Sequence, residues 1–122
     1  SYRPAFADGK QMRDFIAVDD VVDVLCQTLG SYGQGQPVEN GVYNLGTGQA
    51  RTWLDLAHEI FVALDLPAKT EWLEMPEDLR PRYQYFTQAQ MRRLRAQLPQ
   101  MRFTSLELGV KNYIDQLRQR AR

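Results

Sequence analysis

The segment RDFIAVDDVVDVLCQTL, residues 13–29, decides the fold class because it joins two kinds of hydrophobic pattern. Its first part, residues 13–18, is rich in aromatic and β-branched side chains and predicts a short strand. Asp19 and Asp20 then stand where a helix N-cap belongs, and apolar side chains follow at helical spacing up to Leu29. The segment therefore predicts a strand that leads directly into a helix.

The same alternation of strand and helix continues along the chain. Further short strands are expected at residues 41–45 and 70–75. Three further helices are expected, each begun by a threonine with an acidic or amide side chain three residues later. These pairs are Thr52 with Asp55, Thr87 with Gln90, and Thr104 with Glu107. Alternating strands and helices predict an α/β fold with parallel pairing, and three short strands would gain stability by extending a larger sheet from sequence outside this chain.

Size and composition indicate one globular domain over residues 1–122, with 43% apolar and 25% charged residues. Fifteen basic and fifteen acidic side chains cancel, which argues against nucleic acid or an anionic membrane as a partner. No apolar run approaches the roughly 20 residues that span a bilayer. The single Cys26 is expected to be a buried thiol, which fits a cytoplasmic protein. The start at Ser1, without Met or a signal pattern, predicts a piece of a longer protein.

The motifs of the common catalytic sites are absent from the sequence. No glycine run completes G-x-G-x-x-G, and Gly46-Thr47-Gly48 is expected to be a simple strand-to-helix turn. None of the six tyrosines has a lysine four residues later, so the Tyr-x-x-x-Lys proton-transfer pair is missing. One histidine, His58, and one cysteine exclude the usual zinc ligand sets, and His58 is expected to be a solvated helix residue. We therefore expect this chain to be inactive by itself.

Two places could instead bind a ligand. Arg13 at a strand end can hold two phosphate oxygens with its planar fork, or it can form a plain surface pair with Asp14. The segment RPRYQY, residues 80–85, places two cations and two phenols on a constrained turn, with Tyr83 and Tyr85 on one face. Such a turn suits a phosphorylated, hydroxylated ligand, or it forms an aromatic plug.

A cluster of four arginines follows this turn. Without interleaved aromatic residues or a net positive charge, it predicts a solvated face with some acidic partners rather than a nucleic-acid site. The members are Arg92, Arg93, Arg95 and Arg102.

Three blocks of sequence resemble one enzyme family over about residues 6–117. Residues 13–21 and residues 43–48 are similar to patterns found in many nucleotide-sugar epimerases and dehydratases. Residues 82–89, RYQYFTQA, resemble the ADP-glycero-manno-heptose 6-epimerases in particular. The chain thus looks like the small C-terminal, substrate-binding lobe of an extended short-chain dehydrogenase/reductase, without the Rossmann half.

The resemblance implies a role for each half of such an enzyme. The missing N-terminal half would bind NADP and hold the acid/base residues that epimerise the heptose at C6 through transient oxidation, supplying lipopolysaccharide core heptose. This chain would contribute the substrate contacts Arg13 and Tyr83, with a loop of Phe6, Ala7, Asp8 and Gly9 lining the same pocket. That loop is about one residue shorter here than in the family. The full-length enzyme would be a cytoplasmic homo-oligomer.

Two other interpretations stay open. The absence of every catalytic motif also fits a free-standing interaction module with no small-molecule site. The same lobe could alternatively belong to another nucleotide-sugar epimerase or to a 4,6-dehydratase.

Overall fold

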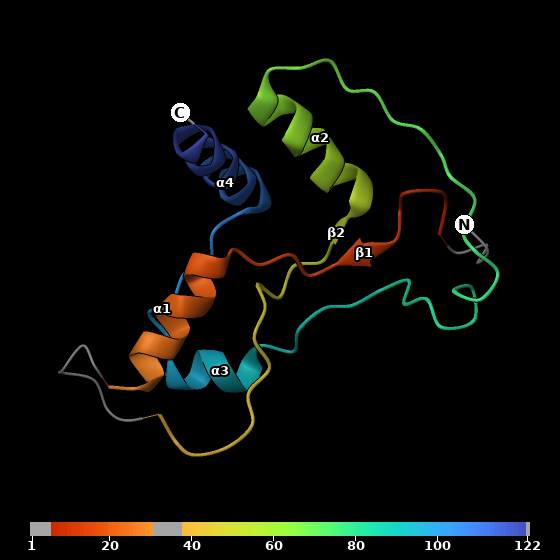
Figure 1. Ribbon diagram of the computed structural model, residues 1–122. Coiled ribbons are helices and arrows are strands. Elements are labelled where there is room, and N and C mark those ends of the chain that lie inside the picture. Colours follow the sequence, from red (N-terminus) through yellow and green to blue (C-terminus); the bar gives the residue numbers. More distant parts are fainter. Residues whose placement is uncertain (1–5, 31–37, 122) are drawn as a thin grey trace.

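The computed structural model describes residues 6–30 and 38–121 of the chain (Figure 1). These residues form four helices and one two-stranded sheet. In chain order the elements are β1 Met12–Arg13, α1 Val18–Thr28, β2 Arg51–Thr52, α2 Trp53–Leu64, α3 Arg92–Gln97 and α4 Leu106–Arg120.

The helices gather in two places with the small sheet between them. Helix α2 packs against α4 in the upper half of Figure 1, while α1 and α3 lie in the lower half. A cluster of buried side chains joins α1 to α3, made by Val24, Met91, Leu94 and Leu98. The long connection between α2 and α3 runs past β1 on its way back.

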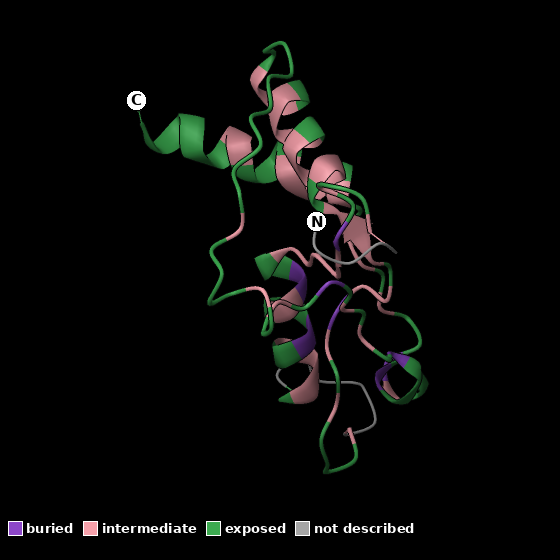
Figure 2. Cartoon of the chain, turned by 90° about the vertical axis from the view of Figure 1, so that its right-hand side faces the viewer, coloured by how far each residue is buried: buried purple, intermediate pink, exposed green. Residues whose placement is uncertain are grey.

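The core of the described residues is small. Five hydrophobic side chains are buried, and Figure 2 shows that half-buried and exposed residues dominate the rest. One side of α1 is apolar and exposed, where Val18, Val22, Leu25 and Leu29 recur at helical spacing with exposed fractions of 48% to 77%. An exposed apolar side of this kind marks a surface that normally packs against another part of a protein.

The expectation of a parallel α/β sheet is wrong for the described residues. Strands β1 and β2 pair antiparallel, with Met12 opposite Thr52, and only an isolated bridge between Met12 and Phe86 is parallel. The strand predicted at residues 13–18 is reduced to Met12–Arg13, and residues 41–45 and 70–75 form no strand. Alternation of apolar and polar residues favours a strand, but a strand forms only beside a second segment that supplies its hydrogen bonds.

The helix predictions are confirmed where the signal was local. Helix α2 begins at the predicted capping box: the Thr52 hydroxyl accepts a hydrogen bond from the Asp55 amide at 3.0 Å, and the Asp55 carboxylate accepts one from the Thr52 amide. In α1 the N-cap is Ala17, so Asp19 and Asp20 lie in the first turn rather than at the cap. There they still face the positive end of the helix dipole.

Two predicted capping boxes are wrong. Helix α3 begins at Arg92 after Met91, while the Thr87 amide donates to the Met12 carbonyl at 3.1 Å. Helix α4 is capped by Ser105, because the preceding Thr104 donates its hydroxyl to Asp20 at 2.8 Å. At Thr104 a tertiary hydrogen bond occupies the hydroxyl that was expected to cap the helix. At Thr87 the backbone bonds to β1, and the helix begins only at Arg92.

Three smaller expectations can be compared with the described residues. Cys26 is half-buried rather than buried. His58 is exposed on α2, as expected. Within residues 6–30 and 38–121, no helix has the length and apolar character needed to cross a bilayer.

Candidate substrate-binding site

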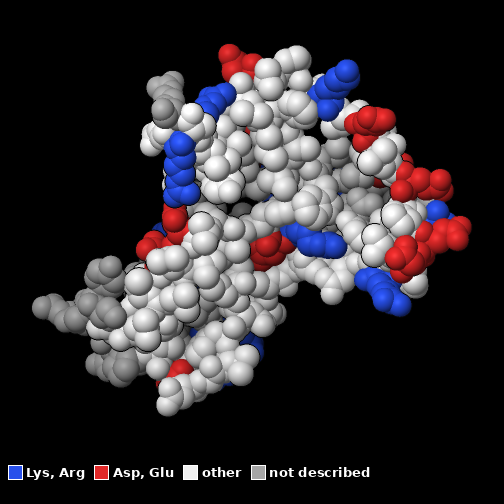
Figure 3. All heavy atoms as spheres, in the orientation of Figure 1, with Lys and Arg blue, Asp and Glu red and all other residues white. Residues whose placement is uncertain are grey.

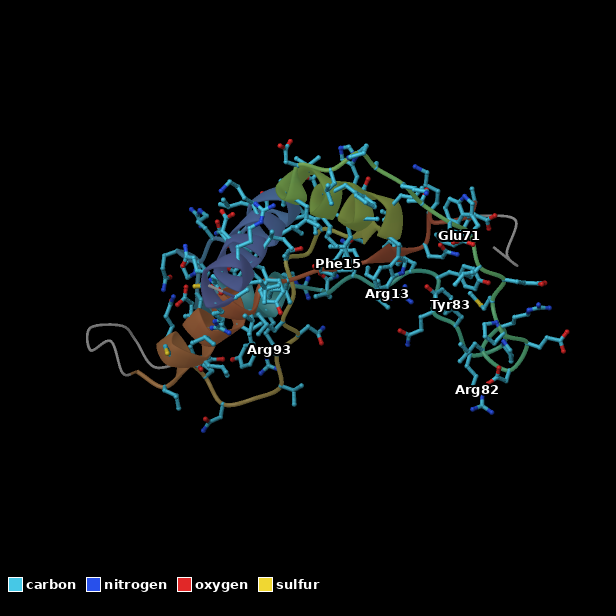
Figure 4. The ribbon with its side chains drawn as sticks, turned by 45° about the horizontal axis from the view of Figure 1, so that its top comes forward. Arg13, Phe15, Glu71, Arg82, Tyr83 and Arg93 are labelled. Atoms are coloured by element: carbon cyan, nitrogen blue, oxygen red, sulfur yellow. The ribbon has the colours of Figure 1, made fainter. Side chains whose placement is uncertain are left out.

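The structure brings Arg13 and Tyr83 together, although they lie far apart in the chain. Residues 82–87 run beside β1, where the Met12 amide donates to the Tyr85 carbonyl at 2.9 Å. The Arg13 guanidinium carbon lies 5.3 Å from the centroid of the Tyr83 ring, and an Nη atom donates to the Gln84 carbonyl. Figure 4 shows the two side chains next to each other, whereas Arg82 points away from them.

A row of aromatic rings stands behind this pair. Tyr83 meets Tyr85 edge to face, with centroids 5.2 Å apart, and Tyr85 meets Phe6 at 5.7 Å. Tyr85 is buried, with 3% of its surface exposed, whereas Tyr83 is half-buried. Tyr85 therefore acts as the aromatic plug, and Tyr83 keeps surface that a ligand can reach.

The charge of Arg13 is held in place without being neutralised. Its hydrogen bonds go to the backbone carbonyls of Met12 and Gln84. It forms no ion pair within the described residues, and the alternative of a surface pair with Asp14 fails because that carboxylate faces other partners. A guanidinium has further N–H donors in a planar fork, so Arg13 can still bind an anion.

The loop of Phe6, Ala7, Asp8 and Gly9 joins this site through Phe6. Ala7 and Asp8 are exposed beside it. Gly9 has a φ of +70° and sits so close to Leu54 that a Cβ atom would meet Leu54 Cγ at 2.5 Å. The loop is thus packed onto α2 at a position where only glycine fits.

Asp14 organises the site, a role that no motif in the sequence indicates. Its carboxylate accepts hydrogen bonds from the Thr47 amide at 2.8 Å, the Gly48 amide at 2.9 Å, the Ala89 amide at 3.0 Å and the Thr47 hydroxyl. Burial raises the pKa of Asp14, but the hydrogen bonds from Thr47, Ala89 and Gly48 outweigh it and hold the pKa below its ordinary value. One ionised carboxylate thus ties the end of β1 to two distant segments.

The same contacts decide whether a dinucleotide fits here. In a dinucleotide site, glycine amides at a strand-to-helix turn point at the pyrophosphate. In the turn of Gly46, Thr47 and Gly48, the amides of Thr47 and Gly48 already donate to Asp14. A Cβ atom on Gly46 would lie 2.5 Å from the Asp14 carboxylate. The turn is filled by a carboxylate, so it does not fit the pyrophosphate of NADP.

Among the described residues, no group of three His, Cys, Asp or Glu side chains could hold a metal ion.

Two clefts of about 510 and 560 Å³ occur in the described part of the chain. Neither of these two clefts is lined by Arg13 or Tyr83.

Comparison with curated proteins shows clear relatives over nearly the whole chain. The chain is homologous to ADP-L-glycero-D-manno-heptose-6-epimerases. It is 48% identical over 116 residues to the protein of that name from Nitratidesulfovibrio vulgaris strain DP4, covering 95% of this chain and 34% of the relative. It is 42% identical to the one from Fusobacterium nucleatum and 39% identical to the one from Alkalilimnicola ehrlichii, covering 35% and 32% of those proteins.

The homology to this heptose epimerase therefore concerns one part of it. The chain spans about a third of the length of the curated relatives it matches. No family model matches the chain.

Proposed function

We propose that this chain is the substrate-binding part of a nucleotide-sugar epimerase that acts on ADP-glycero-manno-heptose at C6. The homology motivates the choice of enzyme. The observation that carries the binding role is the Arg13 guanidinium, fixed by backbone carbonyls beside Tyr83 and not neutralised by a carboxylate among the described residues. An anionic ligand is the natural partner of such a group.

In this proposal, Arg13 and Tyr83 bind the diphosphate of the substrate. The planar fork of Arg13 contacts two phosphate oxygens, and the Tyr83 hydroxyl donates to an oxygen nearby. Tyr85 holds the Tyr83 ring from behind and itself packs against Phe6. Asp14 fixes the backbone on the opposite side of the strand, so that Arg13 keeps its direction.

The partner in this proposal is an N-terminal Rossmann half of the same protein, which binds NADP and performs the redox step. The exposed apolar side of α1 supports this, because it needs a cover (Figure 3 shows the face over α1 as largely uncharged). Residues 42–45 also support it, since this strand-like segment makes no backbone-to-backbone hydrogen bond within the described residues. The added half would supply both the missing surface and the missing strand neighbour.

The direct test is an activity assay on the complete protein, meaning this chain joined to the N-terminal sequence of such an epimerase. The assay would offer a panel of nucleotide sugars and follow epimerisation by NMR. We expect turnover of ADP-glycero-manno-heptose and little or no turnover of nucleotide hexoses. Preferred turnover of a hexose would assign the chain to another epimerase or dehydratase, and no turnover of any sugar would favour the interaction module.

A further inference from the structure

The cleft of about 510 Å³ is lined by three arginines that lie far apart in the chain. They are Arg51 in β2, Arg95 in α3 and Arg102 in the connection to α4. The one acidic side chain in the lining is Glu107. A volume of this size lies in the range of small-molecule sites.

The three arginines differ in whether an acidic side chain neutralises their charge. Arg51 is paired, at 2.8 Å from Glu107 and 3.3 Å from Asp55. Arg95 donates to the Thr47 carbonyl at 2.9 Å, and Arg102 donates to the carbonyls of Pro99 and Met101. Neither Arg95 nor Arg102 forms an ion pair within the described residues, contrary to the expectation of acidic partners for this cluster.

These contacts leave two oriented positive charges at one cleft. A carbonyl directs a guanidinium without neutralising it, so the remaining N–H donors are available to an anion. Glu107 is occupied by Arg51 and does not offset the other two cations. Phe15 and Phe103 supply an apolar part of the same lining.

We propose that this cleft binds a small organic phosphate that carries a planar ring. Arg95 and Arg102 bind the phosphate, and Phe15 and Phe103 contact the ring. The site is separate from Arg13 and Tyr83, which do not line this cleft. The proposal therefore does not depend on the epimerase substrate.

The test is an NMR titration of the chain with AMP and with inorganic phosphate as probes. We expect AMP to bind with a dissociation constant on the order of 1 mM or tighter, and inorganic phosphate to bind more weakly because it lacks the ring. Arg95→Gln and Arg102→Gln should each weaken AMP binding about tenfold, while shifts in the amides of residues 47–49 and 102–106 report the location.

One control variant shows whether AMP binds at this cleft. Arg92→Gln makes the same charge change in α3 at an arginine that does not line the cleft, and it should leave AMP binding unchanged. The proposal is overturned if AMP does not bind, if Arg92→Gln weakens binding as much as the cleft variants do, or if Arg13→Ala weakens binding while Arg95→Gln and Arg102→Gln do not.

Discussion

At the scale of single residues, two neighbours in β1 and its continuation perform opposite tasks. Successive side chains of an extended segment point to opposite sides. Arg13 accordingly faces Tyr83 and Gln84, and Asp14 faces Thr47 and Ala89. The pair that looks like a surface ion pair in the sequence thus consists of a guanidinium held by backbone carbonyls and a carboxylate that anchors distant amides.

The anchor role of Asp14 predicts a loss of stability in Asp14→Asn. The amide keeps the shape of the carboxylate but loses its charge, and its NH₂ group would face backbone donors. Because hydrogen bonds to charged groups are the stronger ones, the free energy of unfolding should fall by about 1.5–3 kcal/mol, measured by urea titration.

The matched control is Asp23→Asn, which makes the same change at an exposed position of α1. It should change the free energy of unfolding by less than about 0.5 kcal/mol. Equal effects of the two substitutions would show that Asp14 is not an anchor.

The lowered pKa of Asp14 also predicts how stability depends on pH. The ordinary pKa of this carboxyl is 3.8, and in the folded chain its pKa is lower. As the pH falls below 3.8, Asp14 therefore binds a proton more readily in the unfolded chain than in the folded one. The free energy of unfolding consequently decreases as the pH falls. The decrease continues through the lower folded pKa. Asp14→Asn should flatten the curve in this window, whereas Asp55, whose pKa is also lowered, contributes equally to both proteins. Parallel curves below pH 3.8 would contradict the assignment.

The sequence pointed to Arg13 and Tyr83, whose binding role stays a prediction, and it did not point to Asp14. A guanidinium and a phenol in motif-like blocks pointed to Arg13 and Tyr83 before the structure placed them together. The partners of Asp14 lie 33, 34 and 75 positions away, and nothing local to an Asp indicates which distant amides it will accept from. The turn at residues 46–48 was expected to follow a strand, but no strand precedes it among residues 41–45, and the Asp14 carboxylate holds it instead.

At the scale of elements, helices followed from local sequence and strands did not. A capping box needs only residues three positions apart, and at Thr52 it is formed as predicted. At Thr104 the buried carboxylate of Asp20 competes successfully for the hydroxyl, so Ser105 becomes the cap. Strands need a second segment, and the neighbours expected for residues 41–45 and 70–75 are not among the described residues.

The capping role of Thr52 predicts that Thr52→Ala lowers the free energy of unfolding by about 1 kcal/mol, because the Asp55 amide loses its acceptor. Thr70→Ala is the control, since Thr70 is exposed and lies outside every helix and strand of the described chain. Chemical denaturation of both variants gives the comparison. If the Thr52→Ala protein is as stable as the control, the Thr52 cap does not stabilise α2.

At the scale of the whole molecule, α1 keeps an apolar side that nothing among the described residues covers. The buried core consists of a few side chains from α1, α3 and the segments beside them, while Val18, Val22, Leu25 and Leu29 remain exposed. The sequence placed Leu25 and Leu29 on one apolar stripe with Val24, and periodicity marks such a stripe without showing what covers it. Only the structure separates the covered side from the open one.

The exposed apolar side of α1 predicts that Leu25→Gln has different effects on stability in this chain and in the complete protein. In this chain the side chain is 54% exposed, so the substitution should change the free energy of unfolding by less than about 0.5 kcal/mol. In the complete protein, where we propose that the surface is covered, it should cost on the order of 2–3 kcal/mol. Differential scanning calorimetry of the substitution in this chain and in the complete protein measures the difference. Equal small effects would show that no partner half covers this side of α1.

The central claim is that Arg13 binds the phosphates of a nucleotide sugar, and calorimetric titration of the complete protein with ADP-glycero-manno-heptose tests it most directly. Loss of a charge-assisted contact of about 1.5–3 kcal/mol should raise the dissociation constant of Arg13→Ala by roughly 10- to 150-fold. Arg13→Lys should recover only part of this, because it keeps the charge without the fork. Arg92→Ala, at an exposed arginine of α3, should bind like the unmodified protein. An Arg13→Ala protein that binds the substrate as tightly as the Arg92→Ala control would contradict the account.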